Sequence, residues 1–133
     1  MRVGLDTSVV LRLLTDSPEG QAQMAWQAIV EVHEGGWQAA VSDMVISEAY
    51  FALQHHYGVP KDEALAQLRK MLESGYVAST GCAAQVLSVP GLATANPGFV
   101  DRMIHAAYLS IVDQMLSFER AARKLPRTRV LGP

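Results

Sequence analysis

Four acidic residues lie at or just past a boundary between expected strands, turns and helices, and they could act together in an active site. They are Asp6, Glu48, Asp101 and Glu119. Ligands of open parallel sheets sit beyond the carboxyl ends of the strands, so we expect the four carboxylates to face one crevice. Clustered carboxylates repel one another and raise their own pKa values unless a cation neutralises them. Because hard divalent ions prefer oxygen ligands, the pattern predicts a site for Mg²⁺ or Mn²⁺.

Each acid alone also has a purely structural interpretation. Asp6 could cap the turn after the first strand, and Glu48 could reach solvent from the rim of an apolar helix. Asp101 and Glu119 could each complement the dipole of a helix start. The prediction of a metal site therefore rests on the four residues taken together.

The elements that must position these acids alternate between strands and helices. Strands are expected over residues 1–5, 38–41, 77–80, 113–117 and 128–131, and helices over residues 18–34, 43–57, 61–74, 83–89, 97–111 and 119–125. Residues 9–14 are expected to form a turn or a short helix. This alternation predicts an α/β fold, with one three-layer α/β/α domain over residues 1–133 and a mostly parallel central sheet.

Local signals define several helix starts. Ser17-Pro18 and Asn96-Pro97 each pair a capping residue with proline, and Ser42 or Asp43 can cap the helix that contains Glu48. The helix after Asn96-Pro97 is expected to bury one apolar side, made of Val100, Met103, Ile104, Ala107, Tyr108 and Ile111.

Composition narrows the class of protein. A length of 133 residues suits one domain, and 50% hydrophobic residues exclude intrinsic disorder. The single cysteine, Cys82, excludes an internal disulfide framework and a cysteine-rich zinc site. Asp6 interrupts the first apolar run, and glycines and prolines break the uncharged stretch 74–100. We therefore expect a cytoplasmic protein without a secretory leader or a membrane span.

Charge is distributed unevenly along the chain. Residues 1–119 carry a net charge of −7, whereas residues 120–133 carry five basic groups and no acid. An acidic body with a basic tail could hold metal ions in one place and a polyanion beside it. The tail could equally be a solvated terminus, or part of the last helix and edge strand.

Four sequence motifs resemble those of a known enzyme family. Leu5-Asp6-Thr7-Ser8-Val9-Val10-Leu11 resembles the opening motif of PIN-domain ribonucleases, especially the VapC-type toxins of toxin–antitoxin pairs. The segment 41–48, ending in Glu48, looks like the second motif, and the segment 99–107, which contains Asp101, is similar to the third. Met115-Leu116-Ser117-Phe118-Glu119 stands where the family usually has a hydroxyl residue, an aromatic residue and an aspartate. The longer glutamate departs from that pattern, and Asp113 competes with Glu119 for the role of fourth acid.

The resemblance implies a PIN-like domain that hydrolyses RNA phosphodiester bonds with Mg²⁺ or Mn²⁺. Asp6, Glu48, Asp101 and Glu119 would be its catalytic and metal-binding residues. Supporting residues would be Thr7, Ser8 and Ser117, and candidates for RNA contacts are Arg120, Arg123 and Lys124. The implied partners are a small VapB-like antitoxin and a second copy of the chain, as a homodimer.

Other functions fit the sequence less well, with one exception. A phosphatase of the haloacid-dehalogenase type needs a second aspartate two residues after the first, where this chain has Ser8. A phosphate-binding loop needs glycines, and residues 6–14 contain none. A PIN-like module that binds RNA or protein with little or no catalysis stays open as an alternative. The sequence does not identify the RNA that would be bound or cleaved.

Overall fold

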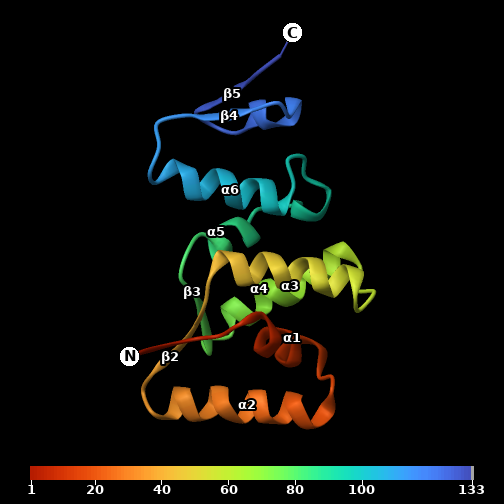
Figure 1. Ribbon diagram of the computed structural model, residues 1–133, viewed down its shortest axis with the longest axis vertical. Helices are drawn as coiled ribbons and strands as arrows, with labels where there is room; N and C mark the ends of the chain where they lie inside the picture. Colours follow the sequence, from red (N-terminus) through yellow and green to blue (C-terminus); the bar gives the residue numbers. More distant parts are fainter. Residues whose placement is uncertain (133) are drawn as a thin grey trace.

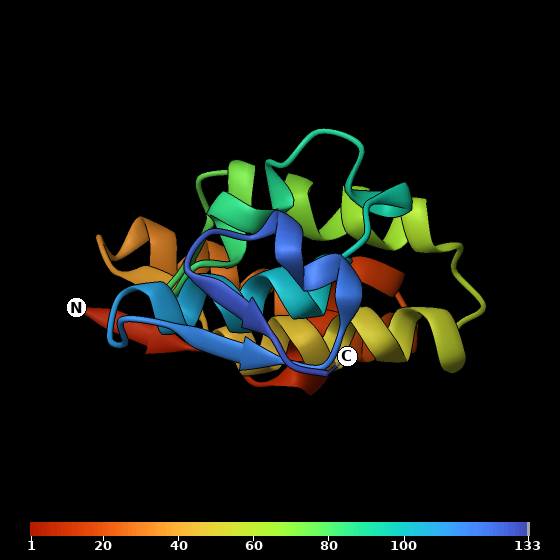
Figure 2. The same ribbon diagram turned by 90° about the horizontal axis from the view of Figure 1, so that it is seen from above.

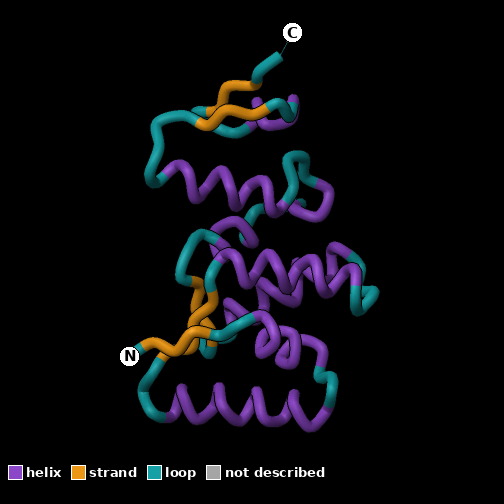
Figure 3. Tube along the Cα trace, in the orientation of Figure 1, coloured by secondary structure: helices purple, strands orange, loops and turns teal. Residues whose placement is uncertain are grey.

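The computed structural model describes residues 1–132, which form a mixed α/β structure (Figures 1 and 3). The helices and strands follow the predicted alternation, with shorter strands than expected. In chain order they are β1 (Arg2–Gly4), α1 (Thr7–Thr15), α2 (Glu19–Glu34), β2 (Gln38–Val41), α3 (Asp43–His55), α4 (Lys61–Glu73), β3 (Val77–Ser79), α5 (Ala83–Leu87), the 3₁₀ turn η1 (Leu92–Thr94), α6 (Phe99–Leu109), β4 (Met115–Ser117), the 3₁₀ helix η2 (Arg120–Lys124) and β5 (Thr128–Val130).

The first three strands form one parallel sheet in the order β1-β2-β3. Arg2 lies opposite Gln38 in the first pair, and Ala39 lies opposite Val77 in the second. Parallel neighbours require long crossover connections, and here each crossover is a pair of helices. The helices α1 and α2 join β1 to β2, and α3 and α4 join β2 to β3. The central strand β2 is almost wholly buried, which explains its apolar sequence.

The last two strands form a separate parallel sheet, in which Met115 lies opposite Thr128 and Ser117 lies opposite Val130. The strands are therefore parallel as predicted, but they lie in two small sheets where one central sheet was expected. Figure 1 shows β4 and β5 at one end of the long axis and α2 at the other, with α6 next to the second sheet. Two contacts hold this end together: His105 Nε2 lies 2.7 Å from the carbonyl oxygen of Pro126, and Arg127 donates to the carbonyl oxygen of Leu109 at 2.9 Å.

The hydrophobic core lies between the first sheet and the helices that pack around it, and it extends to the start of α6. Its largest fully buried side chains are Val10, Ile29, Val41, Ile46, Leu53, Leu68 and Phe99. Phe99 meets the ring of Tyr50 edge-on, with ring centroids 5.0 Å apart. Burying a side chain of this size stabilises a fold by roughly 1.5–3 kcal/mol, so α6 is firmly attached to α3 at this point.

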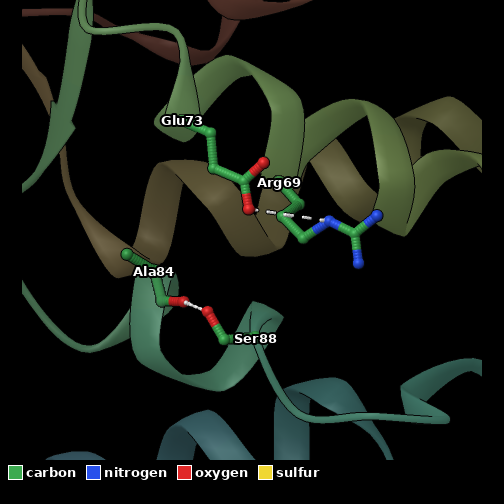
Figure 4. Close-up of polar contacts among 4 residues, drawn as sticks. All are labelled: Arg69, Glu73, Ala84 and Ser88. Carbon is green, nitrogen blue, oxygen red and sulfur yellow. Dashed lines mark hydrogen bonds and ion pairs between the residues drawn. The ribbon is translucent and has the colours of Figure 1, made fainter.

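The helices α4 and α5 face each other beside this core (Figure 4). On α4, Arg69 Nε lies 3.8 Å from the carboxylate of Glu73, one turn later along an exposed face. On α5, the Ser88 hydroxyl donates to the carbonyl oxygen of Ala84 at 2.8 Å. The exposed ion pair contributes only about 0.3–0.5 kcal/mol, so buried apolar contacts rather than charge hold these helices in place.

Two predicted helix starts are wrong by one or two residues. Ser17 does not begin α2: Pro18 occupies the capping position with an extended ψ of 148°, and the first helical residue is Glu19. Asn96 does not cap α6 either, because Gly98 takes that position and Phe99 is the first helical residue. Arg102 explains part of this shift, since its Nε donates to the carbonyl oxygen of Pro97 at 2.7 Å and holds the preceding loop against the helix.

The buried side of α6 also differs from the expected one. Phe99, Met103 and His105 are buried, whereas Ile104 and Tyr108 are exposed. Of the predicted apolar side, Met103 and Val100 face the core as expected, whereas the remaining members, Ile104, Ala107, Tyr108 and Ile111, are exposed. None of the helices in residues 1–132 has the length and apolar character needed to span a membrane.

Candidate functional site

A cavity of about 220 Å³ lies between α6 and the β4–η2 segment, and it brings two of the four predicted acids together. Asp101 comes from the first turn of α6, and Glu119 lies two residues after β4, at the start of η2. Ser117, a predicted supporting residue, lines the same cavity. The remaining walls are largely apolar and include Ile104, Tyr108 and Leu116. The two carboxylates are therefore the charged groups of a mostly apolar hollow.

A local hydrogen bond sets the position of Glu119. Its backbone N–H donates to the Ser117 hydroxyl at 3.0 Å, which tightens the turn between β4 and η2. Asp113 lies at the opposite end of β4, in the loop that precedes the strand. Glu119, and not Asp113, therefore shares the cavity with Asp101.

Asp6 lies two residues after β1 and caps α1. Its carboxylate accepts hydrogen bonds from the Ser8 N–H at 2.8 Å and from the Ser8 hydroxyl at 2.6 Å. These bonds, first the one from the hydroxyl and then the one from the N–H, lower the pKa of the exposed Asp6 carboxyl below its usual value. Ser8 therefore keeps Asp6 ionised, while Thr7 is the first residue of the helix that Asp6 caps.

Glu48 projects from the exposed side of α3. Its neighbours Ile46, Ala49 and Tyr50 are buried, so the helix turns its apolar residues inward and this carboxylate outward. The helix itself packs against α1, which Asp6 caps.

All four acids are exposed, and of the four the structure brings Asp101 and Glu119 to one cavity, while Asp6 caps α1 and Glu48 lies on α3. Among residues 1–132, no three histidine, cysteine, aspartate or glutamate side chains converge closely enough to hold a metal ion. A cage of four carboxylates within one chain therefore stays a prediction.

Asp43 has a structural role that the sequence did not reveal. Its carboxylate accepts hydrogen bonds from the N–H groups of Cys82 at 3.1 Å and Ala83 at 3.0 Å, and the Cys82 thiol lies 3.1 Å away. The side chain thereby joins the start of α3 to the start of α5, while Ser42 caps α3 through its bond from the Val45 N–H. Burial, followed by the hydrogen bond and charge of Asp43, raises the pKa of Cys82 to about 11. Its partners lie 39 and 40 residues away, so no local pattern could indicate them.

The predicted RNA contacts lie immediately after Glu119. Arg120, Arg123 and Lys124 belong to η2, and all three are exposed. Ala121 and Ala122 of the same 3₁₀ helix line the cavity, so these three positive charges lie on an element that borders it.

The donor set at the cavity fits a hard divalent cation. Mg²⁺ is typically held by one or two carboxylates and completes its coordination with water and substrate phosphates. Asp101 and Glu119 supply two carboxylates without a competing thiolate in the cavity lining, which is the ligand chemistry that Mg²⁺ or Mn²⁺ prefers.

Comparisons of the chain with protein-family models, curated proteins and solved structures found no match.

Proposed function

We propose that this protein is a PIN-like endoribonuclease that hydrolyses RNA phosphodiester bonds with Mg²⁺ or Mn²⁺. We further propose that it acts in the cytoplasm as the toxin of a toxin–antitoxin pair, with the three-layer α/β/α organisation of that family. The observation that carries the proposal is the meeting of Asp101 and Glu119, 18 residues apart in sequence, at one cavity beside a basic 3₁₀ helix.

Asp101 and Glu119 would hold the divalent ion, and Asp6 and Glu48 would complete the acidic site. When bound, the ion would lower the pKa of a water molecule that acts as the nucleophile, and it would stabilise the negative charge on the phosphoryl oxygens. Ser8 keeps Asp6 in its charged form, and Ser117 fixes the turn that aims Glu119 into the cavity. Ile104 and Tyr108 line the same cavity and give the two carboxylates apolar neighbours.

The basic residues of η2 would bind the RNA backbone. The acidic body of the chain repels a polyanion, so positive charge is needed close to the carboxylates. Arg120, Arg123 and Lys124 provide three such charges within five residues of Glu119. Contacts of this kind are independent of RNA sequence and weaken as salt concentration rises.

The proposal is tested by incubating the purified protein with end-labelled total RNA, with Mg²⁺, Mn²⁺ or EDTA. We expect cleavage with either ion, none with EDTA, and products that carry a 5′-phosphate. Asp101→Asn and Glu119→Gln should each abolish cleavage while the circular dichroism spectrum stays unchanged. Asp62→Asn, an exposed acid in the first turn of α4, is the matched control and should cleave normally. Full cleavage by both site variants would refute the proposal.

One observation favours a second candidate function, a PIN-like module that binds RNA or protein without cleaving it. Within residues 1–132 the acids do not form a group of three around one point. This candidate predicts RNA binding that is independent of Mg²⁺ and unaffected by Asp6→Asn. The same incubation separates the two functions, because only the nuclease requires the ion.

The antitoxin would be a small protein that places a basic side chain near Asp101 and Glu119. An arginine suits such a site because its guanidinium binds a carboxylate through two parallel hydrogen bonds. Purification of the chain together with a small protein encoded beside its gene would support this partner. Loss of RNA cleavage on adding that protein, restored by excess Mg²⁺, would place the contact at the acidic cavity.

A further inference from the structure

The strand β1 has an open edge. Leu5 N–H donates to Ala40 O at 2.9 Å, and Met1 O accepts from Gln38 N–H at 3.0 Å, so the odd-numbered residues of β1 face β2. In a parallel strand, the N–H and C=O of one residue point to the same side, and those of the next residue point to the opposite side. Arg2 and Gly4 therefore direct their N–H and C=O groups away from β2, where no strand of residues 1–132 pairs with them.

The strand β4 has a matching open edge. Met115 N–H donates to Arg127 O at 2.9 Å, and Ser117 O accepts from Leu131 N–H at 2.7 Å. Leu116, between them, therefore directs its N–H and C=O away from β5. Large apolar side chains surround this edge: the exposed fractions are 57% for Leu116, 78% for Phe118 and 77% for Ile111. Exposed apolar edges of this kind are templates for pairing with another strand.

The chain exposes more surface than a protein of its size normally does. Its accessible surface is 7988 Å² at a mass of 14.4 kDa. A folded monomer of that mass exposes about 6,800 Å², so the excess is about 1,200 Å² per chain. Two copies that buried this excess against each other would form an interface of about 2,400 Å², which exceeds the 1,200–2,000 Å² typical of stable complexes.

The two open edges of one chain are held apart. Phe99 packs on Tyr50, and the Cys82 thiol contacts the carbonyl oxygen of Met103, so α6 is fixed on the side of α3 and α5. His105 and Arg127 then fix the second sheet to α6. Figure 1 shows β4 and β5 beyond α6, far along the long axis from β1, and Figure 2 shows β1 and β4 running in the same direction.

We propose that β4 of one copy pairs in parallel with β1 of a second copy, and reciprocally, in a closed two-fold dimer. Leu116 N–H would donate to Arg2 O, and Gly4 N–H would donate to Leu116 O, which is the hydrogen-bond pattern of a parallel pair. This register joins two small sheets into one five-stranded parallel sheet in each half of the dimer. It also buries Leu116 and Phe118, and reciprocal pairing closes the assembly at two copies.

The register has a consequence for the acidic site, which rests on the proposed function. Asp6 follows the last residue of β1 by two positions, and Glu119 follows the last residue of β4 by two positions. Pairing Gly4 with Ser117 therefore puts Asp6 of one copy level with Glu119 of the other, at the same carboxyl edge of the joined sheet. Each acidic site would then combine Asp6 from one copy with Asp101 and Glu119 from the other.

Cross-linking tests the strand pairing independently of any activity. In a Cys82→Ala background, one copy carries Arg2→Cys and a second copy, with a larger tag, carries Met115→Cys. These positions lie opposite each other in the proposed register, where neighbouring Cα atoms are close enough for a disulfide. We expect a mixed, reducible dimer on oxidation and a dimer mass in sedimentation. A monomer, an open polymer, or a disulfide within a single chain carrying both substitutions would overturn the proposal.

Mixing two inactive variants tests the shared site. Copies with Asp6→Asn and copies with Glu119→Gln, unfolded and refolded together, would form mixed dimers in which one of the two sites is intact. Random pairing makes half of the dimers mixed, so about a quarter of wild-type RNA cleavage should return. No recovery, in a mixture whose cross-linking proves the dimer, would overturn the shared site. If the wild-type protein cleaves no RNA, the proposed function fails and the cross-link still decides the pairing.

Discussion

Replacing Asp43 by alanine should destabilise the fold strongly, although the residue lies outside the candidate site. Its carboxylate accepts bonds from the N–H groups of Cys82 and Ala83, and Ala83 is buried. A hydrogen bond to a charged group contributes about 1.5–3 kcal/mol, and the half-buried Cys82 lies at the low end of that range. We expect Asp43→Ala to lower the free energy of unfolding by about 3 kcal/mol. Asp43→Asn keeps one acceptor oxygen and should cost about half as much.

Urea unfolding followed by circular dichroism measures this free energy. Asp62→Ala is the matched control, because Asp62 also lies in the first turn of a helix but is exposed. Loss of its interaction with the helix dipole should cost less than about 1 kcal/mol. If Asp43→Ala costs no more than this control, the connection between α3 and α5 does not contribute as the structure indicates.

The thiol of Cys82 gives a second measurement of the same contact. Asp43 is one cause of its pKa of about 11, and burial is the larger cause. In Asp43→Asn the pKa should fall part of the way towards the usual value of 9.0, as measured by the pH dependence of iodoacetamide alkylation. Since the folded wild type holds its proton more tightly than the unfolded chain, its stability should decline between pH 9 and pH 11. An unchanged alkylation profile in Asp43→Asn would contradict the assigned cause.

Four further perturbations have defined outcomes. Asp6→Ala should lower the urea midpoint of unfolding because it removes the cap of α1, whereas Asp6→Asn should leave it nearly unchanged because asparagine caps helices equally well. Ser8→Ala should raise the lowered pKa of Asp6, measured by carbon NMR, and should move the acid-side loss of stability to higher pH. Alanine at the three basic residues of η2 should reduce the salt dependence of RNA affinity by a slope of about 2, while Lys70→Ala on α4 should leave it unchanged. His105→Ala removes the bond to Pro126 and should lower the protection of the β4 and β5 amides against hydrogen exchange by about 1–3 kcal/mol.

Local chemistry made much of the secondary structure predictable. Ser42 as a cap fixes the start of α3, and Gly58, with a left-handed φ of 64°, marks the end of that segment. The helix α4 likewise runs from Lys61 to within one residue of its predicted end. Such capping and helix-ending residues act within one or two helical turns, so their effect can be predicted from the sequence without knowledge of the tertiary structure. The wrong starts of α2 and α6 arose where proline itself, or the glycine after it, took the capping position.

The division into two sheets was not predictable in the same way. The partner of β1 depends on where α6 packs, and that depends on Phe99 meeting Tyr50, 49 residues earlier in the chain. The same limit applies to the site. The sequence placed all four acids at or just past the boundaries of elements, and the structure lines one cavity with two of them, Asp101 and Glu119. The sequence could not decide whether Asp6 and Glu48 join them, since that requires knowing which strand edges meet.

The charge of the cavity offers a final way to separate a nuclease from a binding module. Each change of Asp101 or Glu119 to its amide removes one negative charge from a body that carries −7 over residues 1–119. If the acids only repel RNA, both variants should bind RNA more tightly than the wild type, with or without Mg²⁺. If the acids hold the ion, the wild type should gain RNA affinity when Mg²⁺ is added and the variants should lose that gain. Fluorescence anisotropy with a labelled RNA and a Mg²⁺ titration distinguishes the two, because the ion dependence changes only when the carboxylates are its ligands.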